Sequence, residues 1–273
     1  MVAAVRLLGL WHSTTAPPPA APALDSIEGR RPHVPAANRV GRLTSAAVGI
    51  TFRSNGAGVG QDSRRHAPAA CPRCGRTLQE PTVWSSAWRC DWHGEVHPLL
   101  PAFSPSKDGL DGLLRTAGVP VWLPWPLPVG WLVTGFAGAG DERTGVRACA
   151  VALSGPNPLG GPADMMVVAE EPGVGLGAAL AGLDGVDPGA GFCAAPPVAT
   201  ASFGNNHFPL WSVDSKDRAV FAGEVKGLWL WLVLWPDTAG ALLVEPIGLR
   251  DLRDPGQDLD LPFGAVSPRL PAP

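Results

Sequence analysis

Glycine and proline interrupt this chain so often that a fold built on long helices is excluded. Of 273 residues, 34 are Gly and 31 are Pro, so roughly every fourth position favours a turn or breaks a helix. Hydrophobic residues make up 45% of the chain and include 11 Trp, which is enough to fill a packed core. The composition therefore predicts a mainly β protein, with α+β as the alternative, made of short elements.

Charge is divided unevenly along the chain. Residues 1–66 carry eight Arg against three acidic residues, a balance of +5, whereas residues 67–273 carry 13 basic and 21 acidic residues, a balance of −8. A body of that sign repels a phosphate backbone, so nucleic acid is an unfavourable partner for it.

Residues 1–66 have the composition of a disordered segment. An Ala/Pro run at 16–23 is typical of linkers, and no helical or strand periodicity is sustained after it. Arg6 interrupts the apolar N-terminal residues, which argues against a signal peptide, and we expect a cytoplasmic protein. A functional tail is one alternative. Another is a start codon assigned too far upstream, with Val48 or Val59 as the genuine start.

The uncharged stretch 116–140 resembles a membrane span by hydropathy alone. Four prolines within it, at positions 120, 124, 126 and 128, would each remove a backbone donor that hydrocarbon cannot replace, so we expect no membrane span. We interpret residues 101–129 as a short helix at 106–117, capped by Ser106 and stopped at Gly118, followed by a Trp/Pro-rich connector.

The strongest chemical signal is a cysteine and histidine pattern. Cys71, Cys74, Cys90 and His93 form C-x2-C-x15-C-x2-H, a spacing typical of zinc ribbons. Gly follows the second ligand of each half and permits the tight turn that such a knuckle needs. This symmetry favours His93 over the alternative fourth ligand, His97.

Residues 67–100 are therefore predicted to be a zinc-ribbon-like module. Three Cys and one His fill all four positions of a tetrahedral ion, which indicates a structural zinc; disulfides are the weaker alternative. The zinc would staple a segment too short to build its own core, with Val83, Trp84 and Trp88 as its small apolar face.

Residues 130–273 are predicted to be an antiparallel β-rich domain, because short apolar runs alternate there with Gly, Pro, Asp and Asn turns. Both faces of 228–235 are apolar, so this run is expected to be a central strand. The expected strands are 130–136, 146–153, 165–169, 198–203, 210–213, 218–223, 228–235 and 241–249.

Catalytic sequence templates mostly fail. The run Gly173 to Ala178 matches the loose dinucleotide pattern G-x-G-x-x-A, but acidic residues precede it, and a Gly-rich surface loop is the default interpretation. Glu170 and Glu171 are adjacent, so they face opposite sides of a strand and are expected to be solvated. The candidate ligand-loop residues are Asp164, Glu170, Glu171, Gly173 and Gly175.

Several unusual strings resemble an uncharacterised actinobacterial family of unknown function. They are Cys71-Pro72-Arg73-Cys74, Trp84-Ser85-Ser86-Ala87-Trp88, and the stretches 93–99, 119–128, 222–231 and 267–270. The resemblance implies no established activity. A phosphotransacetylase label attached to some relatives has no support in this sequence, because the acidic body offers no evident basic pocket for coenzyme A phosphates.

Two classes of function follow. The first is a zinc-stapled binding or adaptor module that contacts a protein partner, with Trp122, Trp125 and Trp131 as anchors if they are exposed. The second is an enzyme or a protein that binds a small-molecule ligand through the Gly-rich loops of the β domain. The first is preferred, and the protein is more readily interpreted as a non-enzyme.

Overall fold

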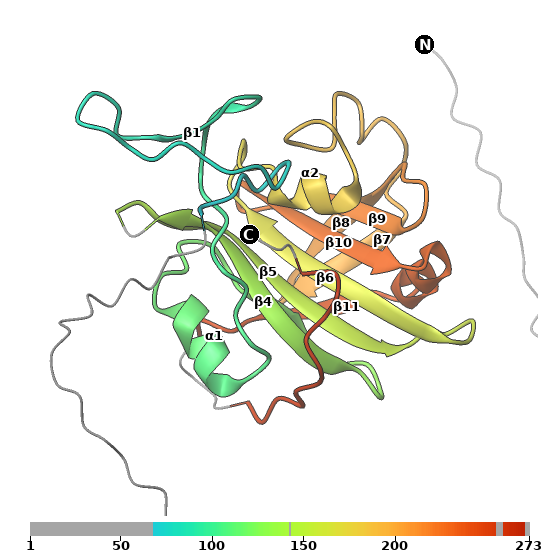
Figure 1. Cartoon of the computed structure of the whole chain (residues 1–273). Coiled ribbons are helices and arrows are strands. Elements are labelled where there is room, and N and C mark those ends of the chain that lie inside the picture. The colour runs from blue at the N-terminus through green and yellow to red at the C-terminus, as the bar shows by residue number, and fades with distance from the viewer. Residues whose placement is uncertain (1–67, 142, 255–258, 271–273) are drawn as a thin grey trace, which may run out of the picture. The chain divides into compact units, whose positions relative to one another are not determined.

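The computed structural model describes residues 68–141, 143–254 and 259–270. All the described residues fall within one compact unit, so the segment that carries the Cys/His pattern (residues 68–100, called the metal-binding segment below) and the β body that follows it belong together (Figure 1). The expectation that residues 1–66 are disordered or misassigned concerns a segment that lies outside the described residues.

The described chain is mainly β, as the sequence predicts. It contains two α-helices, one 3-10 helix and eleven strands. In chain order the elements are β1 (Trp88–Cys90), β2 (Gly94–Val96), α1 (Lys107–Leu114), β3 (Trp122–Pro124), β4 (Leu132–Asp141), β5 (Gly145–Pro156), β6 (Pro162–Glu170), α2 (Leu176–Ala181), β7 (Ala199–Phe203), β8 (Asn206–Val213), β9 (Ala219–Val225), β10 (Leu228–Trp235), η1 (Asp237–Leu243) and β11 (Ile247–Asp251).

Nine strands form one curled sheet in the order β3-β11-β7-β8-β9-β10-β6-β5-β4, and β1 and β2 form a separate two-stranded sheet. Neighbouring strands are antiparallel except β7 and β11, which pair in parallel through Ile247 and Ala201. β3 lies at one end of the strand order, yet it also contacts β5 and β6 near the other end. The sheet therefore curls around the side chains of its inner face.

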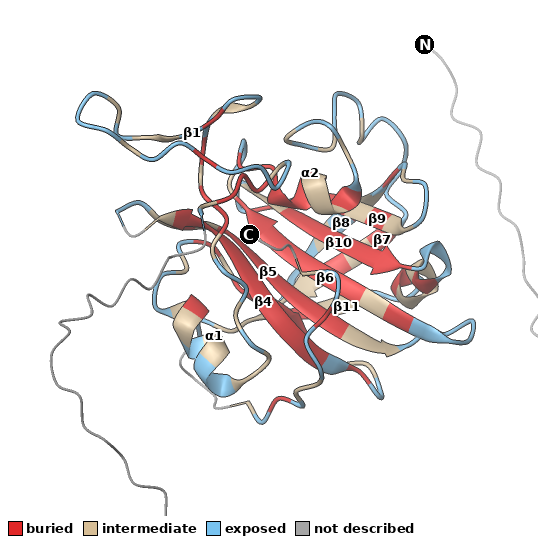
Figure 2. Cartoon of the chain, viewed as in Figure 1, coloured by how far each residue is buried: buried red, intermediate tan, exposed pale blue. Residues whose placement is uncertain are grey.

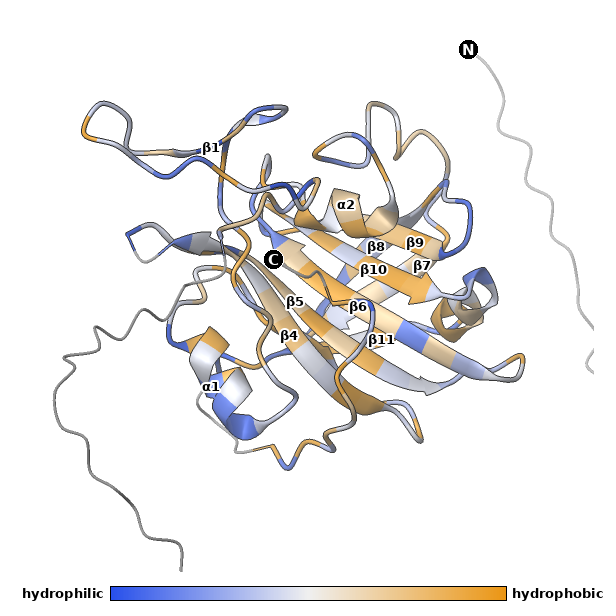
Figure 3. Cartoon of the chain, viewed as in Figure 1, coloured by the Kyte–Doolittle hydropathy of each residue, from blue (hydrophilic) through white to orange (hydrophobic). Residues whose placement is uncertain are grey.

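β10 is a central strand with both faces buried, which confirms the prediction for this run. It pairs with β9 on one side and β6 on the other. Leu230, Leu232 and Leu234 belong to the inner cluster, while Trp231 and Val233 belong to an outer cluster covered by α2. Figure 2 shows that these middle strands are buried over most of their length, and Figure 3 shows hydrophobic residues recurring along them. Alternation along one strand thus builds two cores, one on each side of the sheet.

The short helix α1 begins where the sequence predicts. The Ser106 hydroxyl accepts a hydrogen bond from the amide of Gly109 at 3.0 Å, so Ser106 is the N-cap. The helix is shorter than expected, because its C-cap is Arg115 and the chain turns before Gly118 reaches the carbonyl of Val146.

The prediction of a strand at 241–249 is wrong for the first half of that range. Residues Asp237–Leu243 form the 3-10 helix η1, and only Ile247–Asp251 extend as β11. Gly240 lets the helix approach β9 closely, because a Cβ at this position would lie only 2.8 Å from the Cβ of Ala219. Close packing of the helix on β9 overrides the apolar run in the sequence.

Among the described residues, no helix is long and apolar enough to cross a membrane. The Trp/Pro-rich run that resembles a span supplies β3 and the turn after it.

Helix α2 lies so close to β10 that one methyl group should disturb it. A Cβ at Gly177 would lie 2.2 Å from Cδ1 of Trp231. Alanine favours helix formation, but overpacking costs more, so Gly177→Ala should lower the free energy of unfolding by about 1–3 kcal/mol in urea denaturation. Gly185→Ala is the matched control, because the nearest atom to its Cβ is 3.6 Å away, and it should leave stability within about 0.5 kcal/mol. Equal effects of the two substitutions would contradict the proposed packing.

Candidate metal centre

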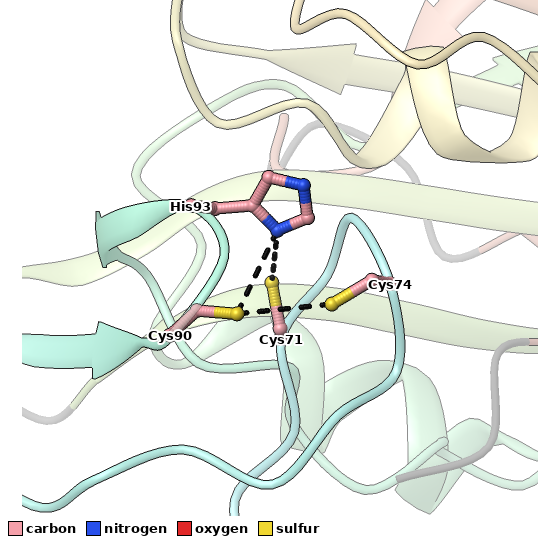
Figure 4. A group of neighbouring side chains, drawn as sticks. All are labelled: Cys71, Cys74, Cys90 and His93. Atoms are coloured by element: carbon pink, nitrogen blue, oxygen red, sulfur yellow. Dashed lines mark hydrogen bonds between the residues drawn. The ribbon is translucent and has the colours of Figure 1, made fainter.

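Four side chains gather at the two knuckles of the N-terminal described segment (Figure 4). Cys71, Cys74, Cys90 and His93 each offer one ligand atom, and these atoms all lie within 4.8 Å of one another. The group contains His93 and not His97. The structure therefore brings together the four residues that the spacing selects.

Three distances between the ligand atoms match those expected around one tetrahedral ion. A tetrahedral ion with metal–sulfur bonds of about 2.3 Å and metal–nitrogen bonds of about 2.0 Å holds neighbouring sulfurs about 3.8 Å apart and a sulfur and nitrogen about 3.5 Å apart. Here Sγ of Cys74 and Sγ of Cys90 are 3.7 Å apart. Nδ1 of His93 lies 3.5 Å from Sγ of Cys71 and 3.6 Å from Sγ of Cys90. These three pairs have the expected spacing and all four ligand atoms lie within 4.8 Å of one another, so the four side chains could hold a metal ion.

Each knuckle aims backbone amides at a sulfur. The amides of Arg73 and Cys74 point at the Cys71 thiol, and those of Trp92 and His93 point at the Cys90 thiol. Gly75 and Gly94, which close the two turns, both have φ of +69°. Amide donors stabilise thiolates, so the backbone is arranged for anionic sulfur at both knuckles.

The two buried thiols differ in acidity. Burial raises the pKa of Cys71 to about 11, against the pull of its two amides. At Cys90 burial also opposes ionisation, but the amides and the neighbouring thiols outweigh it and hold the pKa below its ordinary value. All five cysteines are free, so the disulfide alternative is wrong. The cluster therefore consists of three free thiols and one imidazole that could together hold a metal ion.

The metal-binding segment has only a small core of its own. Cys71, Leu78, Cys90 and Val96 form it, with Trp88 packed against them. Val83 and Trp84, which were expected in this apolar face, are instead 92% and 94% exposed. They lie in the turn between Thr82 and Ser85, outside the small core.

Arg73 anchors this segment to the β body. Its Nε donates to the carbonyl of Val174 at 3.0 Å, and its Nη2 donates to the carbonyl of Gly173. A Cβ at Gly175 would lie 3.0 Å from Arg73 Nε, so the absence of a side chain there admits the guanidinium. Two bridges between single residues, Ala70 to Leu99 and Leu99 to Ala139, continue the contact toward β4. Sequence reasoning missed this role of Arg73, whose only signal is its position between two ligands.

Glu170 lies beneath that anchor and is completely buried, which corrects the expectation that it is solvated. Its carboxyl accepts from the amides of Leu176 at 2.7 Å and Gly177 at 3.2 Å, and from the indole Nε1 of Trp231 at 2.8 Å. Burial raises its pKa to about 7, and the three donors only partly offset this. Glu170 thus ties β6, β10 and α2 together.

The backbone amides that follow the Gly-rich loop already donate to a side chain of the protein. The Glu170 carboxyl occupies the first amides of α2, where a pyrophosphate would bind in a dinucleotide site, and α2 has only six residues. Gly173 and Gly175 adopt φ of +94° and +82° and face Arg73. Glu171 is half-exposed and accepts from Arg147 Nη1 at 2.7 Å. Within the described residues, these four therefore connect parts of the structure.

The remaining candidate residues lie in different parts of the structure. Trp122 and Trp131 are each 3% exposed, so they are core residues and not surface anchors. Trp122 packs edge to face with Phe203 at 4.9 Å because its run forms β3 and closes the sheet. Trp125 is half-buried, with the Arg250 guanidinium 5.5 Å from its ring centroid.

Asp164, on β6, accepts from the Ser154 hydroxyl at 2.7 Å and lines a cavity at the opposite end of the strand from Glu170.

The raised pKa of Glu170 predicts a pH-dependent stability. An unfolded glutamate ionises near pH 4.5, whereas the folded one keeps its proton to about pH 7. The stabilising contribution of the protonated group is therefore complete below pH 4.5 and is lost as pH rises to 7, by on the order of 3 kcal/mol. Urea denaturation across this range should show that loss in the wild type relative to Glu170→Gln, with Glu171→Gln retaining the wild-type profile. A constant difference between wild type and Glu170→Gln would show that Glu170 titrates normally.

Comparisons with known proteins place the chain in a family without assigning an activity. No curated protein and no solved structure gives a significant match to it. Residues 65–270, which include the Cys3His cluster and the whole sheet, match a family of unknown function, DUF6758. The chain belongs to that family.

Proposed function

We propose that this protein is a zinc-stapled binding module whose exposed Val83–Trp84 turn contacts a protein partner. The observation that carries the proposal is a tryptophan and a valine held almost fully exposed at the tip of a segment that the Cys3His cluster organises. A structural role for the ion follows from its four protein ligands, which leave no position open for water or substrate.

Zinc is the metal favoured by this donor set. Thiolate and imidazole ligands at tetrahedral spacing suit zinc, and magnesium or calcium would require oxygen ligands. The small core of the segment explains why an ion is needed, since among the described residues its cluster contains only two buried aliphatic side chains, Leu78 and Val96, beside the two buried ligands. Free thiols are stable in a reducing compartment, which supports a cytoplasmic location.

The turn is built to present its side chains. The Thr82 hydroxyl accepts from the amides of Trp84 and Ser85, both at 3.2 Å, and the base of the loop is held by Arg143, which donates to the carbonyl of Ser86 at 2.9 Å. Figure 2 shows the exposed loops of this segment beside β1. A fixed, exposed tryptophan is the kind of side chain that anchors protein interfaces, because it buries a large area for few rotatable bonds. The proposed contact residues therefore lie in the metal-binding segment and not in the Trp/Pro-rich connector.

Metal content tests the staple. Native mass spectrometry of protein purified without chelator should show one zinc per chain, and Cys74→Ser should lose it because one of four ligands is removed. Cys193→Ser is the control, since Cys193 is also an exposed free thiol but lies outside the cluster. A metal-free wild type, or a Cys74→Ser variant that retains full zinc, would overturn the assignment.

Partner capture tests the binding turn. Purification from the native host should recover a protein whose yield falls at least tenfold in a Val83→Ala, Trp84→Ala double variant, because these side chains form the proposed contact. Val129→Ala provides a control, since Val129 is 94% exposed and lies between β3 and β4. The variant should retain its zinc, so loss of metal cannot explain loss of binding. Unchanged capture by the double variant would refute the proposed surface while leaving the staple intact.

A further inference from the structure

The three thiols of the Cys3His cluster differ in their exposure to solvent. Cys71 is completely buried and Cys90 is 3% exposed, whereas Cys74 is an exposed residue. Gly75 and Arg76, which follow Cys74 along the knuckle, are also exposed. A cysteine reacts with a dissolved reagent only where the reagent has access to it. Cys74 is therefore the thiol of this cluster that a dissolved oxidant can approach.

A second thiol lies beside Cys74. Its Sγ is 3.7 Å from Sγ of Cys90, and Figure 4 shows the two sulfurs facing each other. A disulfide bond is about 2.0 Å long, so the two sulfurs must approach each other by less than about 2 Å. Cys90 is fixed, since it pairs with Gly94 at the end of β1 and belongs to the small core. The Cys74 side has room to move, because a Cβ at Gly75 would meet no atom within 4 Å.

We propose that Cys74 and Cys90 form a thiol pair that a hydroperoxide oxidises to a disulfide, releasing the metal; this regulation rests on the proposed zinc staple. The Cys74 thiolate attacks one oxygen of the hydroperoxide, and the O–O bond breaks. Cys74 becomes a sulfenic acid, and the other oxygen leaves as an alcohol, or as water from hydrogen peroxide, after taking up a proton. The Cys90 thiolate then attacks Sγ of Cys74, the S–O bond breaks, and the hydroxide leaves as water after taking up a proton. The two sulfurs lose two electrons, and the peroxide gains them.

The disulfide would remove two of the four metal ligands. Cys71 and His93 would remain, and two ligands cannot fill the tetrahedral site that four ligands close. All three thiols are free in the structure described here, so the disulfide belongs to the oxidised protein alone. It would join the same two knuckles that the metal joins, at the base of the loop that carries Val83 and Trp84. Oxidation would therefore exchange a metal staple for a covalent one.

Peptide mapping tests the pair directly, because trypsin places each thiol of the cluster on a separate peptide. These peptides are residues 66–73, 74–76 and 90–107. The zinc-loaded full chain is treated with hydrogen peroxide, its remaining thiols are alkylated, and it is digested without reductant. Peptide 74–76 should become joined to peptide 90–107, in proportion to the zinc that a chromogenic chelator detects. Dimedone, which traps sulfenic acids, should label peptide 74–76 and suppress the cross-link.

Cys193 supplies an internal standard for the peroxide dose, since it is an exposed free thiol outside the cluster. Cys193→Ser should leave the cross-link and the zinc release unchanged. Cys74→His keeps a nitrogen ligand but removes the exposed thiol, so a variant that binds zinc should release it at least tenfold more slowly.

Three results would overturn the proposal at a dose that lets dimedone label Cys193. They are no cross-link, a cross-link that uses peptide 66–73 instead, and a cross-link that leaves the zinc bound. A wild type that contains no zinc before oxidation would refute the staple, and the peptide map would then decide the thiol pair by itself. Peptides of the wild type give this answer even where Cys74→His fails to bind zinc.

Discussion

The carboxyl of Glu170 is the point on which the outer face of this protein depends. It is the last residue of β6, and it joins that strand to β10 through Trp231 and to α2 through two amides. The loop that follows it receives Arg73 from the metal-binding segment. A buried carboxyl is costly unless its hydrogen bonds are satisfied, so sheet, helix and loop must assemble together around it. The Gly-rich loop is thus held by contacts within the chain.

The Cys3His cluster lies in a segment that has little hydrophobic core. The segment that carries it buries few apolar side chains of its own, and its contact with the body depends on Arg73 and on single-residue bridges at Ala70 and Leu99. Four ligands converging on one ion would replace the missing hydrophobic core. The arrangement also separates two tasks, because the ligands hold the base of the segment while Val83 and Trp84 remain free at its tip.

Three tryptophans on one face of β10 have three different surroundings. Trp229 packs edge to face with Phe192 at 5.4 Å, Trp231 donates to Glu170, and Trp235 lies at a charged cavity with its indole N–H unsatisfied by the described residues. Strand alternation alone places all three on the same side. What covers each one differs, since the loop that carries Phe192, helix α2 and the C-terminal segment reach different parts of the strand. One stripe of tryptophans thus supplies packing, a buried hydrogen bond and part of the lining of a cavity.

Local sequence determined the features that depend on local spacing. The knuckles needed only two-residue separations followed by Gly75 and Gly94, and the central position of β10 needed only a run that is apolar on both faces. Tertiary structure decided the remaining features, because they depend on contacts between residues that lie far apart in the sequence. Arg73 meets Gly173 about a hundred positions away, Asp164 meets Arg269, and the curl of the sheet buries Trp122 and Trp131. Periodicity assigns a side chain to a face of a strand, but only the packed fold decides whether that face meets solvent, a helix or another charge.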